Sequence, residues 1–103
     1  MSMTVKNQTL DNACVVCVEG EVDVSNADEL RTALNEALQA DADAIEVDVA
    51  QVSYIDSTGI GVLVGAAHRA ADAGKTFAVA HPQRNVERVL AMLGVSEELG
   101  VRA

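Results

Sequence analysis

The spacing of apolar and polar residues changes several times along the chain, and each change marks the boundary of an expected element. Residues 4–9 and 14–18 are rich in β-branched side chains and predict two strands, and the turn residues at 10–13 predict a hairpin between them. The second strand is apolar at successive positions, which is typical of a strand covered on both faces. Residues 44–49 alternate between apolar and acidic side chains and predict a third strand, and residues 76–80 predict a fourth.

Helical spacing follows the second and third strands. We expect the first helix to begin at Ser25 as its N-cap, with Asp28 completing a weak capping box. Its apolar stripe consists of Leu30, Ala33, Leu34, Ala37 and Leu38. The second helix, capped by Ser57 or a neighbour, is expected to run to about Ala73 and to end at Gly74.

A third helix is expected after Pro82, and the glycine at position 94 closes it. Its apolar face consists of Val86, Val89, Leu90 and Leu93. The resulting order, β-β-α-β-α-β-α, predicts an α/β fold with a small mixed β-sheet. Pairing is antiparallel in the hairpin and parallel where helices connect the strands, with the helices packed mainly on one face. We expect a single domain over residues 1–103.

Composition and charge narrow the function classes. Half of the residues are apolar but only 2% are aromatic, so the core is expected to consist of small side chains. A net charge of −9 with seven Lys and Arg argues against a nucleic-acid-binding surface and against an anionic membrane as partner. The chain shows no signal-peptide pattern and no long apolar run. Together with two cysteines, this predicts a cytoplasmic protein.

The two cysteines form a C-x-x-C pattern, Cys14 to Cys17, but lie in a predicted strand. Residues three apart on a strand are about 10 Å apart and face opposite sides of the sheet. A disulfide needs Cα atoms within about 7 Å. Both cysteines are therefore expected to be small core residues, and a redox function is disfavoured.

The most informative segment leads into the second helix with three successive polar residues, Asp56, Ser57 and Thr58. All three can cap backbone N–H groups, so a simple helix N-cap is one interpretation. Three polar residues exceed what one cap needs, however. Gly59 and Gly61 each lower the stability of a helix by about 1 kcal/mol relative to alanine. Glycine is understandable at these positions if other backbone or a partner protein approaches the helix closely. A helix N-terminus also favours anions, including a phosphate on a capping hydroxyl.

Enzymatic and cofactor chemistry finds little support in the sequence. Gly59, Gly61 and Gly65 do not have the spacing of a dinucleotide fingerprint, and there is no P-loop. His68 and His81 have no ligand-spaced partner, so neither a metal site nor a hydrolytic triad is expected. We expect no enzyme, no catalytic residue, no metal and no cofactor. Direct nucleotide binding at the helix N-terminus is a weaker alternative.

The segment from Asp56 to Leu63 resembles the signature of the STAS domain, as found in bacterial anti-sigma factor antagonists. The Gly-Glu-Val-Asp run ending at Asp23 and the residues from Val47 to Ile55 also resemble family elements, though weakly. The resemblance covers roughly residues 4–95.

The resemblance implies a small acidic domain that binds an anti-sigma factor with a protein-kinase-like ATP-binding fold and thereby frees a sigma factor. It implies that this kinase phosphorylates Ser57, that phosphorylation ends binding, and that a separate phosphatase restores it. The implied partner-binding residues are Asp23, Asp56, Thr58, Gly59 and Val62. Val62 and Arg69 are expected to point outward from the second helix, although a partly covered helix side explains Val62 equally well.

A second family member offers an alternative function. A short STAS protein is the accessory subunit of bacterial ABC-type lipid-transport systems, where it contacts the transporter ATPase. This chain resembles that subunit in its short C-terminal end. The subunit usually has threonine at the signature position, and the serine at position 57 favours the antagonist.

Overall fold

The computed structural model describes residues 2–103 and confirms the predicted class and element order. The strands are β1 (Met3–Leu10), β2 (Ala13–Val22), β3 (Ala44–Ile55) and β4 (Thr76–Ala80). The helices are α1 (Ala27–Gln39), α2 (Ser57–Asp72) and α3 (Arg84–Met92). No helix in this described part of the chain is both long enough and apolar enough to cross a membrane.

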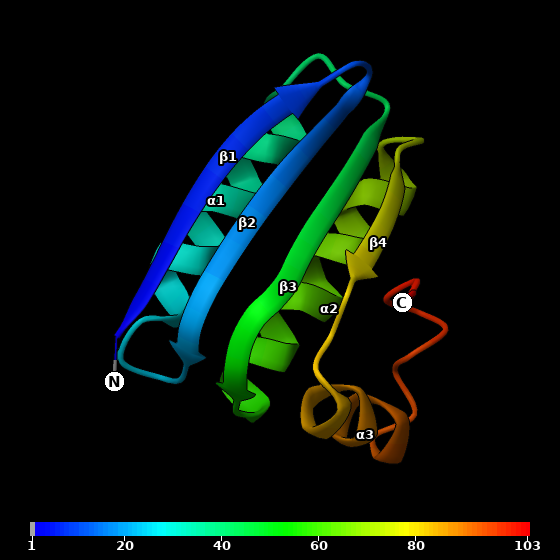
Figure 1. The fold of residues 1–103 in the computed structure, drawn as a ribbon. Coiled ribbons are helices and arrows are strands. Elements are labelled where there is room, and N and C mark those ends of the chain that lie inside the picture. Colours follow the sequence, from blue (N-terminus) through cyan, green and yellow to red (C-terminus); the bar gives the residue numbers. More distant parts are fainter. Residues whose placement is uncertain (1) are drawn as a thin grey trace.

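The four strands form one sheet in the order β1-β2-β3-β4. The β1–β2 pair is antiparallel and closes at Asp11, which has a φ of 54°. The β2–β3 and β3–β4 pairs are parallel, as the helical connections between them require. Figure 1 shows α1 and α2 on the same face of the sheet and α3 beyond the end of β4. This arrangement confirms the prediction of a mixed sheet with helices mainly on one face.

The expectation that the second strand is covered on both faces is wrong. Cys14, Val16 and Val18 face α1 and α2 and are buried. On the other face Val15 and Cys17 are only half-buried, because no described helix lies there. Cys17 is therefore not a core residue, although both cysteines are free and lie on opposite faces as predicted.

The third strand extends to Ile55, six residues beyond the predicted end at residue 49. The prediction stopped early because two irregularities change the spacing of the buried residues. The partner of Cys17 is Asp48, but the partner of Glu19 is Gln51, so β3 has an extra residue there, and a second extra residue follows. The Asp48 carboxylate accepts the Ala50 N–H at 3.0 Å and supports the bulge. Buried positions change from every second residue before the bulge to every third residue after it. The strict alternation that marks a strand therefore ends at residue 49.

The first helix begins later than predicted, and Ser25 is not its N-cap. The N-cap position is Asn26, which is buried. The Asn26 side-chain oxygen accepts the Asp23 N–H, and its side-chain amide nitrogen donates to the Glu21 carbonyl, both at 2.9 Å. Ser25 instead donates its hydroxyl to Asp23. The loop between β2 and α1 is thus held by its own side chains.

The last helix and the tail complete the core. Val86 and Leu90 of α3 are buried as predicted, whereas Val89 and Leu93 are exposed, so its buried face is narrower than the pattern indicated. Leu99 of the tail is fully buried. Beyond it, the backbone runs along the outer edge of β4.

Candidate functional site

The parallel pairing of β2 and β3 brings two segments of the candidate site together. Val22 pairs with Ile55 at the carboxyl ends of the two strands, and the Asp56 N–H donates to the Val22 carbonyl at 3.1 Å. Asp23 follows Val22 directly, so its loop leaves the sheet beside the start of α2 (Figure 1). The topology of the sheet therefore places these two segments side by side.

Asp56 is the N-cap of α2. Its carboxylate is half-buried and accepts the Gly59 N–H at 3.0 Å. Ser57 and Thr58 form the first turn and are exposed. Neither of their side chains makes a hydrogen bond within residues 2–103. One carboxylate therefore does the capping, and two hydroxyls remain free at the helix N-terminus.

The two glycines of the motif have different environments. Gly59 is buried, and a Cβ at this position would lie 2.7 Å from a methyl group of Val22 and 2.8 Å from Cγ1 of Ile55. Its first turn thus packs directly on the ends of β2 and β3. Gly61 is exposed, and a Cβ there would meet nothing within 4 Å. Close packing explains Gly59, but no contact within the described residues explains Gly61.

The prediction that Val62 points outward is wrong. Its side chain is only 6% exposed and belongs to the hydrophobic core. Val62 lies three residues after Gly59, and this spacing places both on the buried side of α2. Neither residue offers a partner much contact area. The solvent side of the first half of the helix is formed by Ser57, Thr58 and Gly61 instead.

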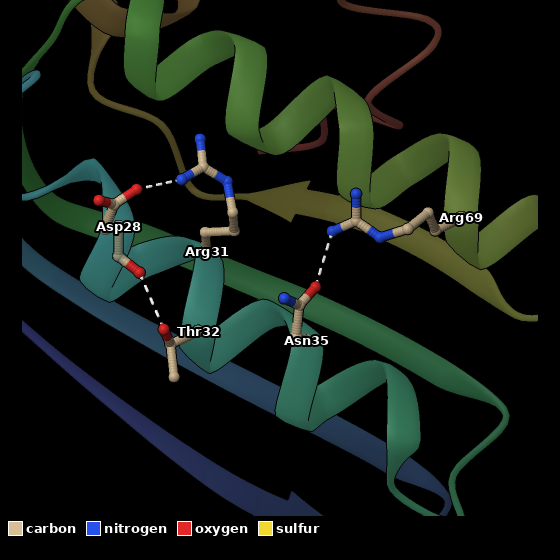
Figure 2. Close-up of polar contacts among 5 residues, drawn as sticks. All are labelled: Asp28, Arg31, Thr32, Asn35 and Arg69. Carbon is tan, nitrogen blue, oxygen red and sulfur yellow. Dashed lines mark hydrogen bonds and ion pairs between the residues drawn. The ribbon is translucent and has the colours of Figure 1, made fainter.

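Arg69 is exposed as predicted, but it serves a contact within the domain. Its guanidinium donates to the Asn35 side-chain oxygen at 2.9 Å, which links α2 to α1 (Figure 2). It lies twelve residues beyond Ser57 on a helix with a rise of about 1.5 Å per residue, so about 18 Å separates them along the axis. Arg69 is thus remote from the candidate site.

Two exposed apolar residues at this end of the sheet were missed from the sequence. Val24 is 74% exposed in the loop after β2, and Tyr54 is 43% exposed near the end of β3. Tyr54 pairs with Glu21, so both residues flank the point where β2 and β3 end. For Val24, the sequence did offer a signal: it is an apolar residue inside the polar run from Asp23 to Asn26, where no core position was expected.

The electrostatics of this end are acidic. The Ser25 hydroxyl, which donates to the Asp23 carboxylate, lowers the pKa of that group, and the backbone N–H groups of Ser25 and Asn26 act in the same direction. Asp23 therefore stays ionised at neutral pH. Asp23 and Asp56 together make this end of the sheet acidic, and the exposed Ser57 hydroxyl lies next to them.

Metal-ligating side chains, or a basic side chain near Ser57, would be needed for a metal or catalytic centre within residues 2–103. Over residues 2–103, no group of three or more His, Cys, Asp or Glu side chains is placed to hold a metal ion. His68 contacts Glu98 in the tail, and His81 follows β4, so neither meets Ser57 as a general base. The site offers an accessible hydroxyl and a contact surface.

Comparisons with known proteins identify the family of this chain. A family model described as "Mlab, STAS domain" matches residues 5–101. An anti-sigma-B factor antagonist of Staphylococcus epidermidis is 34% identical over 100 residues, which cover 97% of this chain and 81% of that protein.

Solved structures show the same fold. An anti-sigma factor antagonist from Mycobacterium paratuberculosis has a TM-score of 0.88 at 21% identity, covering 97% of this chain and 85% of that one. The anti-sigma factor antagonist SpoIIAA in its unphosphorylated form has a TM-score of 0.81 at 18% identity, covering 97% and 89%. Because the family model spans nearly the whole chain and the relative matches over the same extent, the chain belongs to the STAS domain family.

Proposed function

We propose that this protein is an anti-sigma factor antagonist, a non-enzymatic binding protein that is switched by phosphorylation of Ser57. The observation that carries the proposal is the exposed Ser57 hydroxyl at the start of α2, which forms no hydrogen bond within residues 2–103 and lies near the carboxylates of Asp23 and Asp56. The name of the 34% identical relative supports the same function. The partner is an anti-sigma factor with a kinase-like ATP-binding fold, and a phosphatase reverses the modification.

The proposed partner surface surrounds Ser57 and consists of Asp23, Val24, Tyr54, Thr58 and Gly61. The two apolar side chains provide the contact area that Val62, being buried, does not provide. Gly61 allows the partner backbone to approach α2 closely, because a Cβ at this exposed position would stand in the way. Asp56 contributes by fixing the first turn of the helix.

Phosphorylation would act on this surface rather than on the core. A phosphate adds a charge of about −1.5 to −2 at neutral pH. It would form beside the carboxylates of Asp23 and Asp56, in an interface that excludes water. Repulsion and desolvation together cost several kcal/mol, which is enough to release a partner. Because Ser57 is exposed, the domain need not change shape.

The proposal is tested by incubating the protein with its cognate anti-sigma kinase and ATP and locating the phosphate by mass spectrometry. We expect phosphate on Ser57. Ser57→Ala should keep partner binding and lose phosphorylation, and Ser57→Asp should weaken binding. Thr58→Ala is the matched control and should still be phosphorylated. Phosphate found only on another residue would contradict the assignment of Ser57.

A second candidate function is a subunit bound to an ABC-type transporter ATPase. The observation in its favour is that the matching family model is described as "Mlab, STAS domain" and not as an antagonist. A pull-down from the native cell separates the two functions. Recovery of a transporter ATPase without a sigma regulator would favour the subunit and contradict the antagonist.

A further inference from the structure

The two edges of the sheet differ in how they are covered. At the β4 edge, the Val79 N–H donates to the Leu99 carbonyl at 3.0 Å, and the Arg102 N–H donates to the Val79 carbonyl at 3.0 Å. The tail thus occupies the backbone groups on that side. At the opposite edge, β1 has a neighbour only in β2 among the described strands. Figure 1 shows β1 running along the outside of the sheet with α1 behind it.

The hydrogen-bonding pattern between β1 and β2 shows which backbone N–H and C=O groups of β1 point away from the sheet. The Glu21 N–H donates to the Ser2 carbonyl at 3.0 Å, so this pair is hydrogen-bonded across the ladder. Hydrogen-bonded pairs alternate along an antiparallel ladder, so the even residues of β1 bond to β2. The odd residues therefore direct their N–H and C=O groups to the free edge, and they are Met3, Val5, Asn7 and Thr9.

The odd residues also direct their side chains toward α1. Val5 pairs with Val18 and Asn7 with Val16, and both partners lie on the helix-covered face. A groove of about 360 Å³ runs between β1 and α1 beside this free edge. Its lining residues are Val5, Asn7, Glu29, Thr32, Ala33 and Glu36. The outward backbone groups and the groove therefore belong to the same stretch of β1.

One polar atom in the groove lacks a partner. The Asn7 amide nitrogen donates to the Ala33 carbonyl at 2.9 Å, while the Asn7 side-chain oxygen is buried without a hydrogen bond in the described chain. A buried acceptor without a donor is unfavourable in the free chain. Thr32 cannot provide that donor, since its hydroxyl is bonded to the Asp28 carbonyl at 3.0 Å (Figure 2).

The outer wall of the groove is acidic. Glu29 and Glu36 lie seven residues apart on one side of α1, both are exposed, and neither forms an ion pair within residues 2–103. Two copies joined edge to edge through β1 would bring these carboxylates together on protomers that each carry a net charge of −9. The charges therefore favour a basic occupant over a second copy of this chain.

Nothing in β1 blocks the addition of a strand. Its register with β2 runs without a bulge from Met3 to Leu10, and it contains no proline. Its one lysine, Lys6, pairs with Cys17 and so lies on the face away from the groove. Apart from Lys6, β1 lacks the devices with which exposed edges are usually protected.

We propose that the β1 edge is a second binding surface, which receives an extended segment of a partner protein as a fifth strand. The segment pairs with the outward backbone groups of Val5 and Asn7 and directs alternate side chains into the groove. Glu29 and Glu36 are about 10 Å apart along the helix, and strand residues four apart are about 13 Å apart. An arginine-x-apolar-x-arginine pattern therefore fits, with the apolar side chain over Val5 and Ala33.

The test uses a seven-residue peptide in which threonine alternates with arginine, valine and arginine. Amide spectra of the ¹⁵N-labelled full chain are recorded with and without it, together with hydrogen exchange. We expect the amides of Val5 and Asn7 to shift and to become protected, whereas those of Lys6 and Gln8, already bonded to β2, change little. No binding up to millimolar peptide, or shifts confined to the Ser57 end, would refute the proposal.

Charge variants test the acidic wall. Glu29→Lys combined with Glu36→Lys should weaken peptide binding by about tenfold, since reversing two exposed ion pairs changes the binding free energy by about 1–2 kcal/mol. Asp72→Lys combined with Glu87→Lys makes the same change in net charge on α2 and α3 and should keep the affinity. An equal loss in both variants would contradict a specific groove. A β1-mediated dimer of the free chain in sedimentation would also overturn the proposal.

Discussion

Gly59 and Gly61 lie two residues apart in one motif, yet alanine should have opposite effects on stability at the two positions. At Gly59, the new Cβ would lie 2.7 Å from Cγ1 of Val22 and 2.8 Å from Cγ1 of Ile55. Both neighbours are buried and β-branched, so neither can rotate away cheaply. At Gly61, the new Cβ would enter open space.

The magnitudes follow from two opposing effects. Overpacking a close-packed site costs about 1–3 kcal/mol, while alanine in place of glycine gains about 1 kcal/mol in a helix interior. Because two stiff side chains block the Gly59 site, we expect Gly59→Ala to lower the free energy of unfolding by about 1–2 kcal/mol. Gly61→Ala carries only the favourable effect and should raise it by about 0.5–1 kcal/mol.

Urea unfolding followed by far-UV circular dichroism measures both changes, because the chain has no tryptophan for fluorescence. Each 1 kcal/mol also shifts the melting temperature of a domain this size by about 4–8 °C. Gly61→Ala is then assayed for anti-sigma factor binding, which should weaken although the fold is more stable. A Gly59→Ala variant as stable as the parent chain would refute the packing argument.

Two further predictions concern Leu99 in the tail and Asp23 in the loop after β2. Leu99→Ala removes a fully buried side chain and should cost about 2–5 kcal/mol of unfolding free energy, with faster hydrogen exchange at the Val79 amide that the tail bonds. Asp23 has a pKa lowered below its ordinary value of 3.8, chiefly by the Ser25 hydroxyl, so its contribution to stability is present above that pH and is lost as the pH falls through the lowered pKa. In an NMR titration, Ser25→Ala should therefore raise the pKa of Asp23 toward 3.8, and no change would contradict this cause.

The order of elements was predictable because most of them have a regular period. The helical stripe on α1 and the glycine after α2 predicted those elements closely, and Gly74 has the positive φ expected at a helix end. The second half of β3 was not predictable, because its extra residues change the period of the buried positions from two to three. The bulge is stabilised by the Asp48 carboxylate, and a single aspartate in a strand does not reveal a bulge in the pattern of apolar and polar residues.

The site was predictable in its motif but not in the orientation of α2. Between Gly59 and Ala67 every residue is apolar or glycine, so no polar stripe marks the solvent side. The solvent side carries Gly61 and the buried side carries Val62. Nothing in the run of apolar residues indicated which of these two neighbours would be exposed. The exposed apolar residues Val24 and Tyr54 lie in a loop and in the bulged end of β3, where exposure depends on tertiary structure.

The proposed switch at Ser57 and the proposed binding surface beside β1 should act independently. Val5 pairs with Val18, which lies four residues before Val22 and hence about 13 Å along the strand from the Ser57 end. The two strand spacings between β1 and β3 add about 10 Å across the sheet. At Val5 both separations exceed the Debye length of about 8 Å at physiological salt, so the charge of a phosphate is screened before it reaches this part of the groove. Ser57→Asp should therefore weaken binding of the anti-sigma factor and leave the affinity for the basic peptide unchanged. A matching loss of peptide affinity in calorimetry would show that the two surfaces are coupled through the sheet.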